Sequence, residues 1–247
     1  MEANCGKNKH SPKVLGIKLN NLSGEEINRW LCDILSGPPR QKFVVTLNPE
    51  IILEGRRDEV YGNILNNADL CVCDGIGVKL ISLLKGVKVK ARKTGVEITE
   101  FLLAAAKKEG RSVLIIAKKN GLSDPEEIRK AVEERYGVRA EAACFDDNLL
   151  NSQKAKNSEI ILVNFGAPQQ EKFIIKYRSN FPNAKILVGV GGAIDFLTGK
   201  TVRAPHWMRK AGLEWFWRFM KQPRRIKRIA SAVLVFPAKA LINFREK

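Results

Sequence analysis

The chain has 247 residues, 45% of them hydrophobic and 28% charged, which is enough for one substantial α/β domain with an appendage, or for two small domains. Lys and Arg number 43 against 26 Asp and Glu, a net charge of +17 that favours a polyanionic partner: nucleotide phosphates, nucleic acid or an anionic membrane surface. The longest apolar run, residues 229–238, is about half of what a bilayer-spanning helix needs, so a membrane-spanning chain is excluded.

The start of the chain and its cysteines indicate the compartment. The first residues carry no apolar segment typical of a signal peptide, and none of the five cysteines forms a C-x-x-C pair. We therefore expect reduced thiols, mostly packed in the core, and a cytoplasmic location.

Short β-branched runs alternate with helical patterns along the chain. Strands are predicted over 14–19, 42–47, 69–73, 112–117, 159–165 and 185–190. Helices are predicted from 23 toward 35, over 49–67, near 78–84, from 94, from 123, and between the last two strands. This repetition predicts an α/β fold with a Rossmann-like, mostly parallel sheet flanked by helices. Ligands bind such sheets at the carboxyl edge, so polar residues directly after strands are the first candidates for a site.

Two strand ends in the first third of the chain carry polar side chains. Thr46 and Asn48 alternate at the end of strand 42–47, so both side chains could point the same way. Asn48 is either a site residue or the N-cap of the following helix. Asp74 follows strand 69–73 and precedes two glycines; its carboxylate either acts as a general base or closes an Asx-turn.

Two later segments also have the composition of a ligand edge. Arg92 stands beside the N-terminus of the helix from 94, where it is either a group that holds a diphosphate or a solvated charge, while Glu97 is explained as a capping-box residue. After strand 159–165, a glycine turn leads into Gln169, Gln170 and Glu171. Glutamine both donates to and accepts from sugar hydroxyls or a uracil.

The glycine run 188–193, which contains Gly191 and Gly192, resembles a dinucleotide-binding loop only weakly. A complete G-x-G-x-x-G/A would need Gly or Ala where Ile194 stands, and the run lies late in the chain. We interpret it as close backbone packing or a phosphate-facing turn, and expect no bound NAD.

Metal and nucleotide-triphosphate motifs are missing from the sequence. There is no D-x-D, the two histidines are His10 and His206, and no P-loop is present. We therefore expect neither metal nor cofactor. A transferase of this sequence would need Arg, Lys and backbone N–H groups to neutralise a leaving diphosphate.

The last fifth of the chain is basic and aromatic. Residues 200–247 contain thirteen Lys and Arg against two Glu, so +11 of the +17 lies there. Aromatic rings prefer the headgroup level of a membrane and basic side chains attract anionic lipid, which predicts a helical, membrane-docking appendage over 201–247 on a core of residues 1–200. Alternatively, the tryptophans staple a core-packing tail whose charges are solvated. The residues assigned to docking are Trp215, Trp217, Lys221, Arg224 and Lys227.

Taken together, seven segments resemble the WecG/TagA/CpsF glycosyltransferase family of bacterial surface-polymer synthesis. They are, in order, TLNPE, CDGIGV, ARKTGVE, GAPQQE, VGVGGAIDFLTGK, RAP and GLEWFWRFMKQPRRIKR. The match extends from Thr46 to Arg228, and the shared order and spacing carry it. The chain departs from the family pattern at Glu97, where Asp is more usual, and at Gln169, where Lys is frequent.

The resemblance implies an inverting, metal-independent transfer on an α/β core whose C-terminal appendage docks on the membrane and completes the site. Asp74 would deprotonate the acceptor hydroxyl, and Thr46 and Asn48 would contact the acceptor or donor sugar. Three tail arginines would reach the diphosphates. The residues expected to bind substrate are Arg92, Gly95, Gln169, Gln170, Glu171, Gly191, Gly192, Arg218, Arg225 and Arg228.

Within the family, length and tail resemble the N-acetylmannosaminyltransferases that begin the wall teichoic acid linkage. The expected reaction moves N-acetylmannosamine (ManNAc) from UDP-ManNAc to undecaprenyl-diphospho-N-acetylglucosamine (GlcNAc) in β linkage, at the inner face of the membrane. UDP-N-acetylmannosaminuronate and UDP-glucose stay open as donors, and a homo-oligomer stays open. Outside the family, a basic nucleic-acid-binding module is permitted by charge but lacks any such motif, and a nicotinamide-dependent oxidoreductase is weakened by the incomplete glycine run. We expect no nucleic-acid partner.

Overall fold

A six-stranded parallel sheet forms the centre of the protein, in a computed structural model that describes residues 11–221 and 226–245, without the side chains of 227, 228 and 243–245. The strand order is β4-β3-β8-β7-β5-β6, and every pairing is parallel. The strands are β3 (Lys42–Leu47), β4 (Leu70–Cys73), β5 (Val113–Ala117), β6 (Glu141–Cys144), β7 (Ile160–Asn164) and β8 (Ile186–Gly189). The predicted α/β fold with a parallel sheet is confirmed.

Continuous apolar runs explain why the sheet is buried on both faces. Every residue of β4, β5, β7 and β8 is buried, as parallel strands covered by helices require. The edge strand β6, with the sequence EAAC, is partly exposed and was not predicted, because it lacks the β-branched residues that mark a strand. Within the described residues, Cys71 and Cys73 are buried and free, as expected of core packing.

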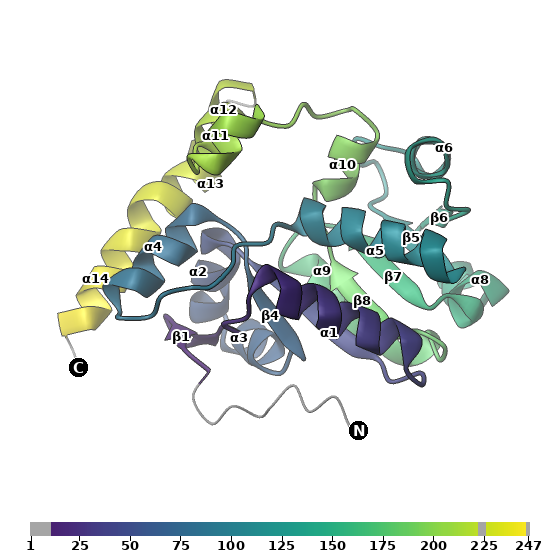
Figure 1. Cartoon of the computed structure of the whole chain (residues 1–247), viewed down its shortest axis with the longest axis horizontal. Coiled ribbons are helices and arrows are strands. Elements are labelled where there is room, and N and C mark those ends of the chain that lie inside the picture. Colours follow the sequence, from purple (N-terminus) through teal and green to yellow (C-terminus); the bar gives the residue numbers. More distant parts are fainter. Residues whose placement is uncertain (1–10, 222–225, 246–247) are drawn as a thin grey trace.

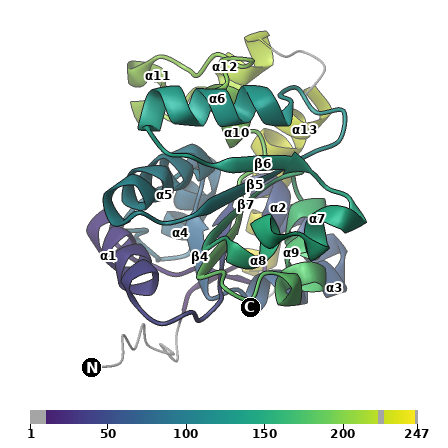
Figure 2. The same ribbon diagram turned by 90° about the vertical axis from the view of Figure 1, so that its right-hand side faces the viewer.

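Helices cover both faces of the sheet (Figures 1 and 2). One face packs on α1 (Gly24–Ser36), α5 (Gly95–Glu109), α6 (Pro125–Tyr136) and α10 (Ala193–Leu197). The other packs on α2 (Pro49–Arg57), α3 (Glu59–Asn66), α7 (Asp147–Asn151), α8 (Gln153–Asn157) and α9 (Gln169–Tyr177), which the turn η1 (Arg178–Asn180) follows. Each set surrounds its own apolar cluster, so the sheet separates two layers of core.

Three predicted elements differ from the structure, each for a local reason. The single strand expected over 14–19 is wrong: Leu15 and Gly16 adopt positive φ angles of 50° and 87°, and the chain turns there between β1 (Lys13–Val14) and β2 (Ile17–Lys18). The single helix expected over 49–67 is two helices, because Asp58 leaves the helical conformation and caps α3 through the N–H of Tyr61 at 3.0 Å. The cap of α6 is Asp124 and not Ser123.

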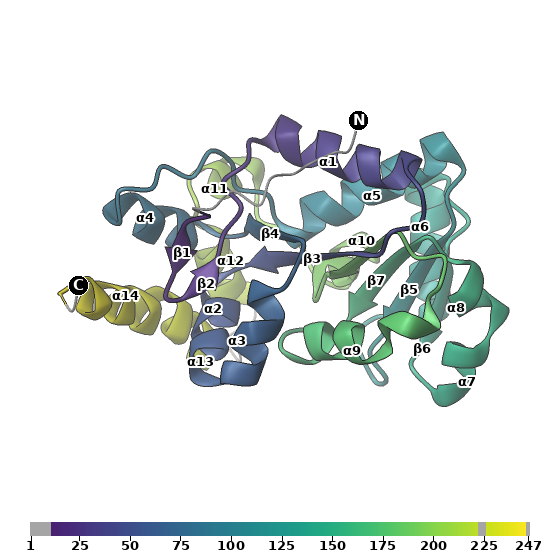
Figure 3. The ribbon, with the colours of Figure 1, turned by 90° about the horizontal axis from the view of Figure 1, so that it is seen from below.

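The C-terminal segment returns to the core after α10. It forms α11 (His206–Lys210), α12 (Glu214–Lys221), α13 (Ile226–Ala230), the π-helical turn η3 (Ser231–Val235) and α14 (Phe236–Arg245). Figures 1 and 3 show α14 alongside α4 (Ile76–Leu84), which follows β4. Phe236 is fully buried in the apolar cluster that also contains residues of α2 and α3. Within the described ranges, no helix combines the length and the apolarity that crossing a bilayer needs.

Candidate active site

A large pocket opens at the carboxyl edge of the four neighbouring strands β4, β3, β8 and β7. Its volume is about 1110 Å³. Thr46 lies near the end of β3, Asn48 follows it, and Asp74 follows β4. The other lining residues at this edge are Gly166, Ala167, Pro168 and Gln170 after β7, and residues 189–193 at the end of β8. The structure thus brings together polar strand ends that lie up to about 150 residues apart in the sequence, at the edge where parallel α/β sheets bind ligands.

The C-terminal segment forms one wall of this pocket. Lining residues come from α12, η3 and α14, and the N-terminus of α5 contributes Thr94, Gly95 and Val96. The wall residues from the C-terminal segment are Glu214, Arg218, Lys221, Ser231, Val235 and Lys239. The pocket therefore depends on the tail for its shape and for part of its positive charge.

Asp74 lies inside the pocket and is only partly exposed. Its carboxylate Oδ2 accepts a hydrogen bond from the N–H of Gly95, the first residue of α5, at 3.2 Å. Burial raises the pKa of Asp74 to about 6, while this hydrogen bond and the charges of Arg218 and Arg92 act in the opposite direction. A carboxylate with a pKa near neutrality, open to a pocket, has the properties of a general base.

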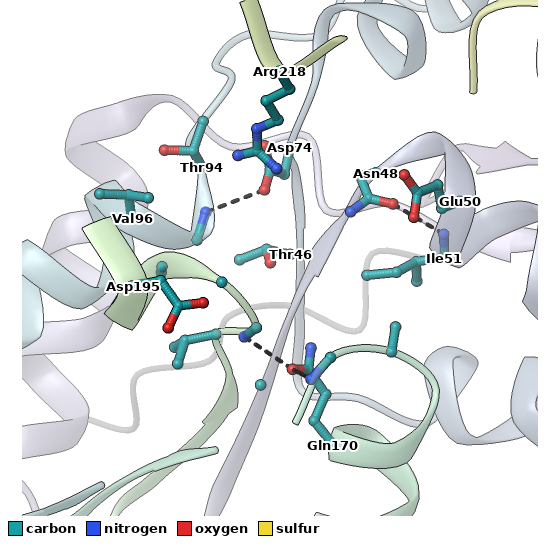
Figure 4. Close-up of a pocket in the computed structure, with 18 of the residues that line it drawn as sticks. Thr46, Asn48, Glu50, Ile51, Asp74, Thr94, Val96, Gln170, Asp195 and Arg218 are labelled. Carbon is teal, nitrogen blue, oxygen red and sulfur yellow. Dashed lines mark hydrogen bonds between the residues drawn. The ribbon is translucent and has the colours of Figure 1, made fainter. Parts of the chain in front are cut away.

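Gly95, Thr46 and Asn48 surround this carboxylate. A Cβ on Gly95 would lie 3.5 Å from Thr46 Oγ1 and 4.0 Å from Asp74 Oδ2, so the glycine keeps this corner of the pocket open. Asn48 caps α2, because its Oδ1 accepts from the N–H of Ile51 at 3.0 Å. Figure 4 shows the amide nitrogen of Asn48 turned toward the pocket. The N-cap interpretation of Asn48 is therefore confirmed, and its amide nitrogen is left facing the pocket.

Gln170 links the turns that follow β7 and β8. Its Oε1 accepts from the N–H of Gly166 at 3.1 Å and from that of Gly191 at 2.9 Å. A Cβ on Gly189 would lie 2.5 Å from the Nε2 of Gln170, which confirms the interpretation of the glycine run as close backbone packing. Gln170, Gly191 and Gly192 line the pocket, but the Gln170 amide is committed to shaping it.

The neighbours of Gln170 do not line the pocket, contrary to expectation. Successive helical residues point about 100° apart, so three consecutive side chains at the start of α9 cannot share one direction. Gln169 is exposed on the outer surface. Glu171 is 1% exposed beneath the pocket, where it accepts from Tyr61 Oη at 2.9 Å and from Gln170 Nε2 at 2.7 Å. Burial raises the pKa of Glu171, and its contacts give it a structural role.

Arg92 also lies outside the lining of this pocket. Its Nη2 donates to the carbonyl oxygen of Arg209 at 2.9 Å, which fixes α11 to the segment before α5. It lines a separate shallow depression with Lys93 and Glu97. Glu97 completes the capping box of α5 with Thr94, as predicted.

Arg218, on α12 of the tail, lies beside the carboxylate of Asp74. Figure 4 shows its guanidinium beside Asp74, and its charge lowers the pKa of Asp74. The Nη2 of Arg218 pairs with Glu214 Oε1 at 3.1 Å, and its guanidinium lies 5.3 Å from the centroid of Phe196. Arg224 and Arg225 fall outside the described residues, as do the side chains of Lys227 and Arg228.

The tail tryptophans divide between the two interpretations made from the sequence. Trp217 donates its Nε1–H to the carbonyl oxygen of Val202 at 3.0 Å, and Lys221 lies 5.2 Å from its ring centroid. Trp217 therefore helps to attach α12 to the preceding segment. Trp215 is 37% exposed and packs edge-on against Phe216, and Trp207 is 65% exposed, so both present apolar surface to solvent.

Sequence reasoning missed acidic residues of the pocket, of which two are prominent. Asp195 lines the pocket and points into it in Figure 4, while its Oδ1 accepts from the Ser123 hydroxyl at 2.9 Å. Asp195 lies in the first turn of α10, just after the glycine turn that follows β8. A search for polar residues after strands would have found it if it had been extended into the first turn of the next helix. Glu214, also missed, raises the pKa of Asp74.

Among the described residues, cationic side chains and carboxylates line the pocket in equal number, five of each. In the parts of the chain that the structure describes, no three His, Cys, Asp or Glu side chains are grouped to hold a metal ion. The cationic side chains that line the pocket are Arg57, Lys200, Arg218, Lys221 and Lys239. These are groups that can bind diphosphate directly.

Comparisons with known proteins agree with this geometry. The sequence profile of the glycosyl transferase WecG/TagA/CpsF family matches residues 12–247. The chain is similar to the N-acetylglucosaminyldiphosphoundecaprenol N-acetyl-beta-D-mannosaminyltransferase of Bacillus subtilis (strain 168), with 34% identity over 83% of this chain and 79% of the relative. Proteins of the same name from Bacillus spizizenii and Staphylococcus aureus (strain MRSA252) are 34% and 28% identical, each over 76% of this chain and 75% and 76% of theirs.

Proposed function

The chain belongs to the glycosyl transferase WecG/TagA/CpsF family, and we propose that it transfers N-acetylmannosamine from UDP-ManNAc to undecaprenyl-diphospho-GlcNAc in β linkage. The names of its relatives support this acceptor and this transferred sugar. The observation that carries the proposal is Asp74: a carboxylate with a raised pKa, in a pocket that a basic tail helps to enclose.

The chemistry is a single displacement at the anomeric carbon. The acceptor hydroxyl oxygen attacks C1 of an α-linked donor while the C1–O bond to the diphosphate breaks, and UDP leaves with the bonding electron pair. Asp74 takes the proton of the attacking hydroxyl. Each glycosidic bond formed therefore releases one proton from the acceptor and one UDP anion from the donor. Inversion at C1 gives the β-glycoside. Thr46 and Asn48 are within the same corner of the pocket and contact the reacting sugars.

Positive side chains stabilise the leaving diphosphate in this scheme. Arg218 and Lys221 on α12 line the pocket, and Arg225 and Arg228 follow in the sequence. Cationic groups held before the reaction stabilise charge as it develops on UDP, the role that a metal ion performs in many sugar transferases. Transfer is accordingly metal-independent.

The tail also docks the enzyme on the membrane that holds its lipid-linked acceptor. Residues 201–247 form the appendage and residues 1–200 the catalytic core. Apolar side chains exposed on the tail support this role: Trp207, Phe219, Met220, Ile226 and Leu234 are 37–68% exposed, in a segment rich in Lys and Arg. Docking takes place on the anionic inner face of the cell membrane, where the product enters teichoic acid synthesis.

A panel assay of UDP release tests the proposal. Purified full-length protein is incubated with a short-chain lipid-diphospho-GlcNAc and, in turn, UDP-ManNAc, UDP-N-acetylmannosaminuronate, UDP-glucose and UDP-GlcNAc. UDP release that needs both UDP-ManNAc and the acceptor is expected. UDP release with another donor would change the proposed donor sugar but not the proposed class of reaction. The proposal would be overturned if the protein released no UDP with any donor, or if it bound DNA and no UDP-sugar.

A further inference from the structure

Helix α4 is apolar on two faces, of which only one is buried. Val78 and Ile81 pack into the core. On the other side, Leu80, Leu83 and Leu84 are 53%, 56% and 58% exposed, and their i, i+3, i+4 spacing places them on one face. A helix that is hydrophobic all round is normally buried, so this three-leucine face requires a partner.

The charge around α4 indicates what that partner is. Residues 75–96 contain six Lys and Arg and no Asp or Glu. Lys79 and Lys88 are exposed, and Lys79 lies on α4 itself, one helical turn before Leu83. A two-fold contact with a second copy through this face would bring two cationic surfaces together, which is unfavourable. An anionic bilayer accepts leucine side chains in its acyl region and attracts the lysines at its surface.

Helix α4 lies beside α14 of the tail, and the tail also exposes apolar side chains. Gly77 on α4 approaches α14: a Cβ there would lie 3.9 Å from the ring of Phe236. On η3 and α14, Leu234, Leu241 and Ile242 are 68%, 51% and 60% exposed. Figures 1 and 3 show α4 and α14 side by side at one end of the molecule.

We propose that α4 is a second membrane-contacting element, built into the catalytic core, whose leucines insert into an anionic lipid surface together with the tail. Because α4 begins two residues after Asp74, this contact holds the base at a fixed depth relative to the bilayer. The inference rests on the proposed function only for the presence of a lipid-linked acceptor.

Vesicle binding by the full-length protein tests this role. The variant L80S/L83S/L84S is compared with wild type and with Val60→Ser, a control at a 68% exposed position on α3. Sedimentation is measured with vesicles of phosphatidylglycerol and phosphatidylcholine, and with phosphatidylcholine alone. The triple variant should bind anionic vesicles more weakly, by about tenfold or more, because three leucine side chains are no longer transferred from water into the lipid. K79Q/K88Q should weaken binding in low salt and have little effect in high salt.

Two turnover measurements separate this inference from the proposed function. With a short water-soluble acceptor, the triple variant should match wild type, and with an acceptor embedded in vesicles it should be slower. If wild type fails on the soluble acceptor too, the proposed function fails. If the triple variant binds vesicles as wild type does, the role of α4 is overturned. A change from dimer to monomer in sedimentation velocity, with vesicle binding unchanged, would assign the leucines to self-association and overturn it equally.

Discussion

Asp74 is held where its ionised form is least favoured. Its pKa in the folded protein is about 6, against 3.8 for the unperturbed side chain. The unfolded chain therefore loses this proton at lower pH than the folded chain does, and stability falls as the pH rises through the interval between the two values. The proposed role of Asp74 as a general base accounts for this loss of stability, because a base works best with a pKa near the working pH.

Replacing Asp74 by Asn should separate stability from activity. Turnover should fall by roughly 10² to 10⁴, the effect of a lost general base. Asn cannot ionise, so the variant avoids the loss of stability that wild type shows when Asp74 ionises. At pH 8 its free energy of unfolding should therefore exceed that of wild type by about 1 to 3 kcal/mol, and the difference should be smaller at pH 4. Urea unfolding at both pH values and UDP release measure the two effects. A folded variant with near-normal turnover would remove Asp74 from the mechanism.

The pH profile of kcat/KM should report the same carboxylate. Activity should decline below about pH 6, by roughly tenfold per pH unit, as Asp74 becomes protonated. Arg218→Met removes a cation that lowers this pKa, so the midpoint of the acid limb should move to higher pH. Arg129→Met, at an exposed arginine of α6, is the matched control and should leave the midpoint unchanged. A midpoint that is the same in the Arg218 variant as in wild type would show that the limb belongs to another group.

A site residue could be predicted from the sequence where neighbouring residues decide the direction of its side chain, and not where a distant contact decides it. Thr46, Asn48 and Asp74 stand at the carboxyl ends of strands, and a parallel sheet brings such ends together. Arg92 could not be placed in this way, because its direction is fixed by the carbonyl of Arg209, 117 residues later. Gln169 and Glu171 were assigned from composition, whereas helical geometry decides which side chain faces the pocket.

At the level of elements, the tail belongs to both the core and the pocket. Phe236 and Ala240 are buried in an apolar cluster with residues of α2, α3 and α9, and Arg218 lies near the base. The parallel sheet, however, ends at Gly189, before the tail begins. Removal of the tail thus uncovers apolar surface without breaking a strand pairing.

Deletion of residues 201–247 should leave a folded α/β core of lower stability. Thermal unfolding by circular dichroism should show a cooperative transition at a reduced Tm, because the cluster loses Phe236. Transfer should be nearly abolished and binding to anionic vesicles lost. If the truncated protein turns over normally and still binds vesicles, the tail only packs against the core.

Charge reversal distinguishes a catalytic appendage from an anchor. Reversal of Arg218, Arg225 and Arg228 to Glu should lower turnover even with a water-soluble acceptor, which needs no membrane. Reversal of Lys107, Lys108 and Lys130, exposed on α5 and α6, changes the net charge equally and should not. Normal soluble-acceptor turnover in the first variant would leave the tail with an anchoring role alone.

The order of the elements could be read from the sequence better than their ends and edges. Five of the six sheet strands are runs of mostly apolar residues, because both faces of the sheet are buried, and such runs are recognisable in the sequence. Strand β6 has no such signal, because its sequence EAAC lacks the β-branched residues that mark a strand. The hairpin at Leu15 and the break at Asp58 depend on single backbone conformations that apolar periodicity does not encode.

On the scale of the whole molecule, the proposed transfer uses cationic side chains where many sugar transferases use a metal ion. The pocket lining includes cations from α2, α12 and α14. Activity should therefore persist, within about twofold, in excess EDTA. The control is a D-x-D glycosyltransferase assayed in the same buffer, which should lose activity. Complete loss of activity here, restored by Mn²⁺ or Mg²⁺, would overturn the cationic stabilisation of UDP.

The central claim is a single displacement by which Asp74 and the basic tail join ManNAc to a diphospho-GlcNAc acceptor. The most direct test is the structure of the product made from UDP-ManNAc and a short-chain lipid-diphospho-GlcNAc, with the anomeric configuration read from the one-bond carbon–proton coupling in NMR spectra. The account predicts one ManNAc residue in β linkage to the GlcNAc, one UDP released per linkage, and no product from the Asp74→Asn variant beyond its residual rate. An α-linked product, which requires retention, would contradict it.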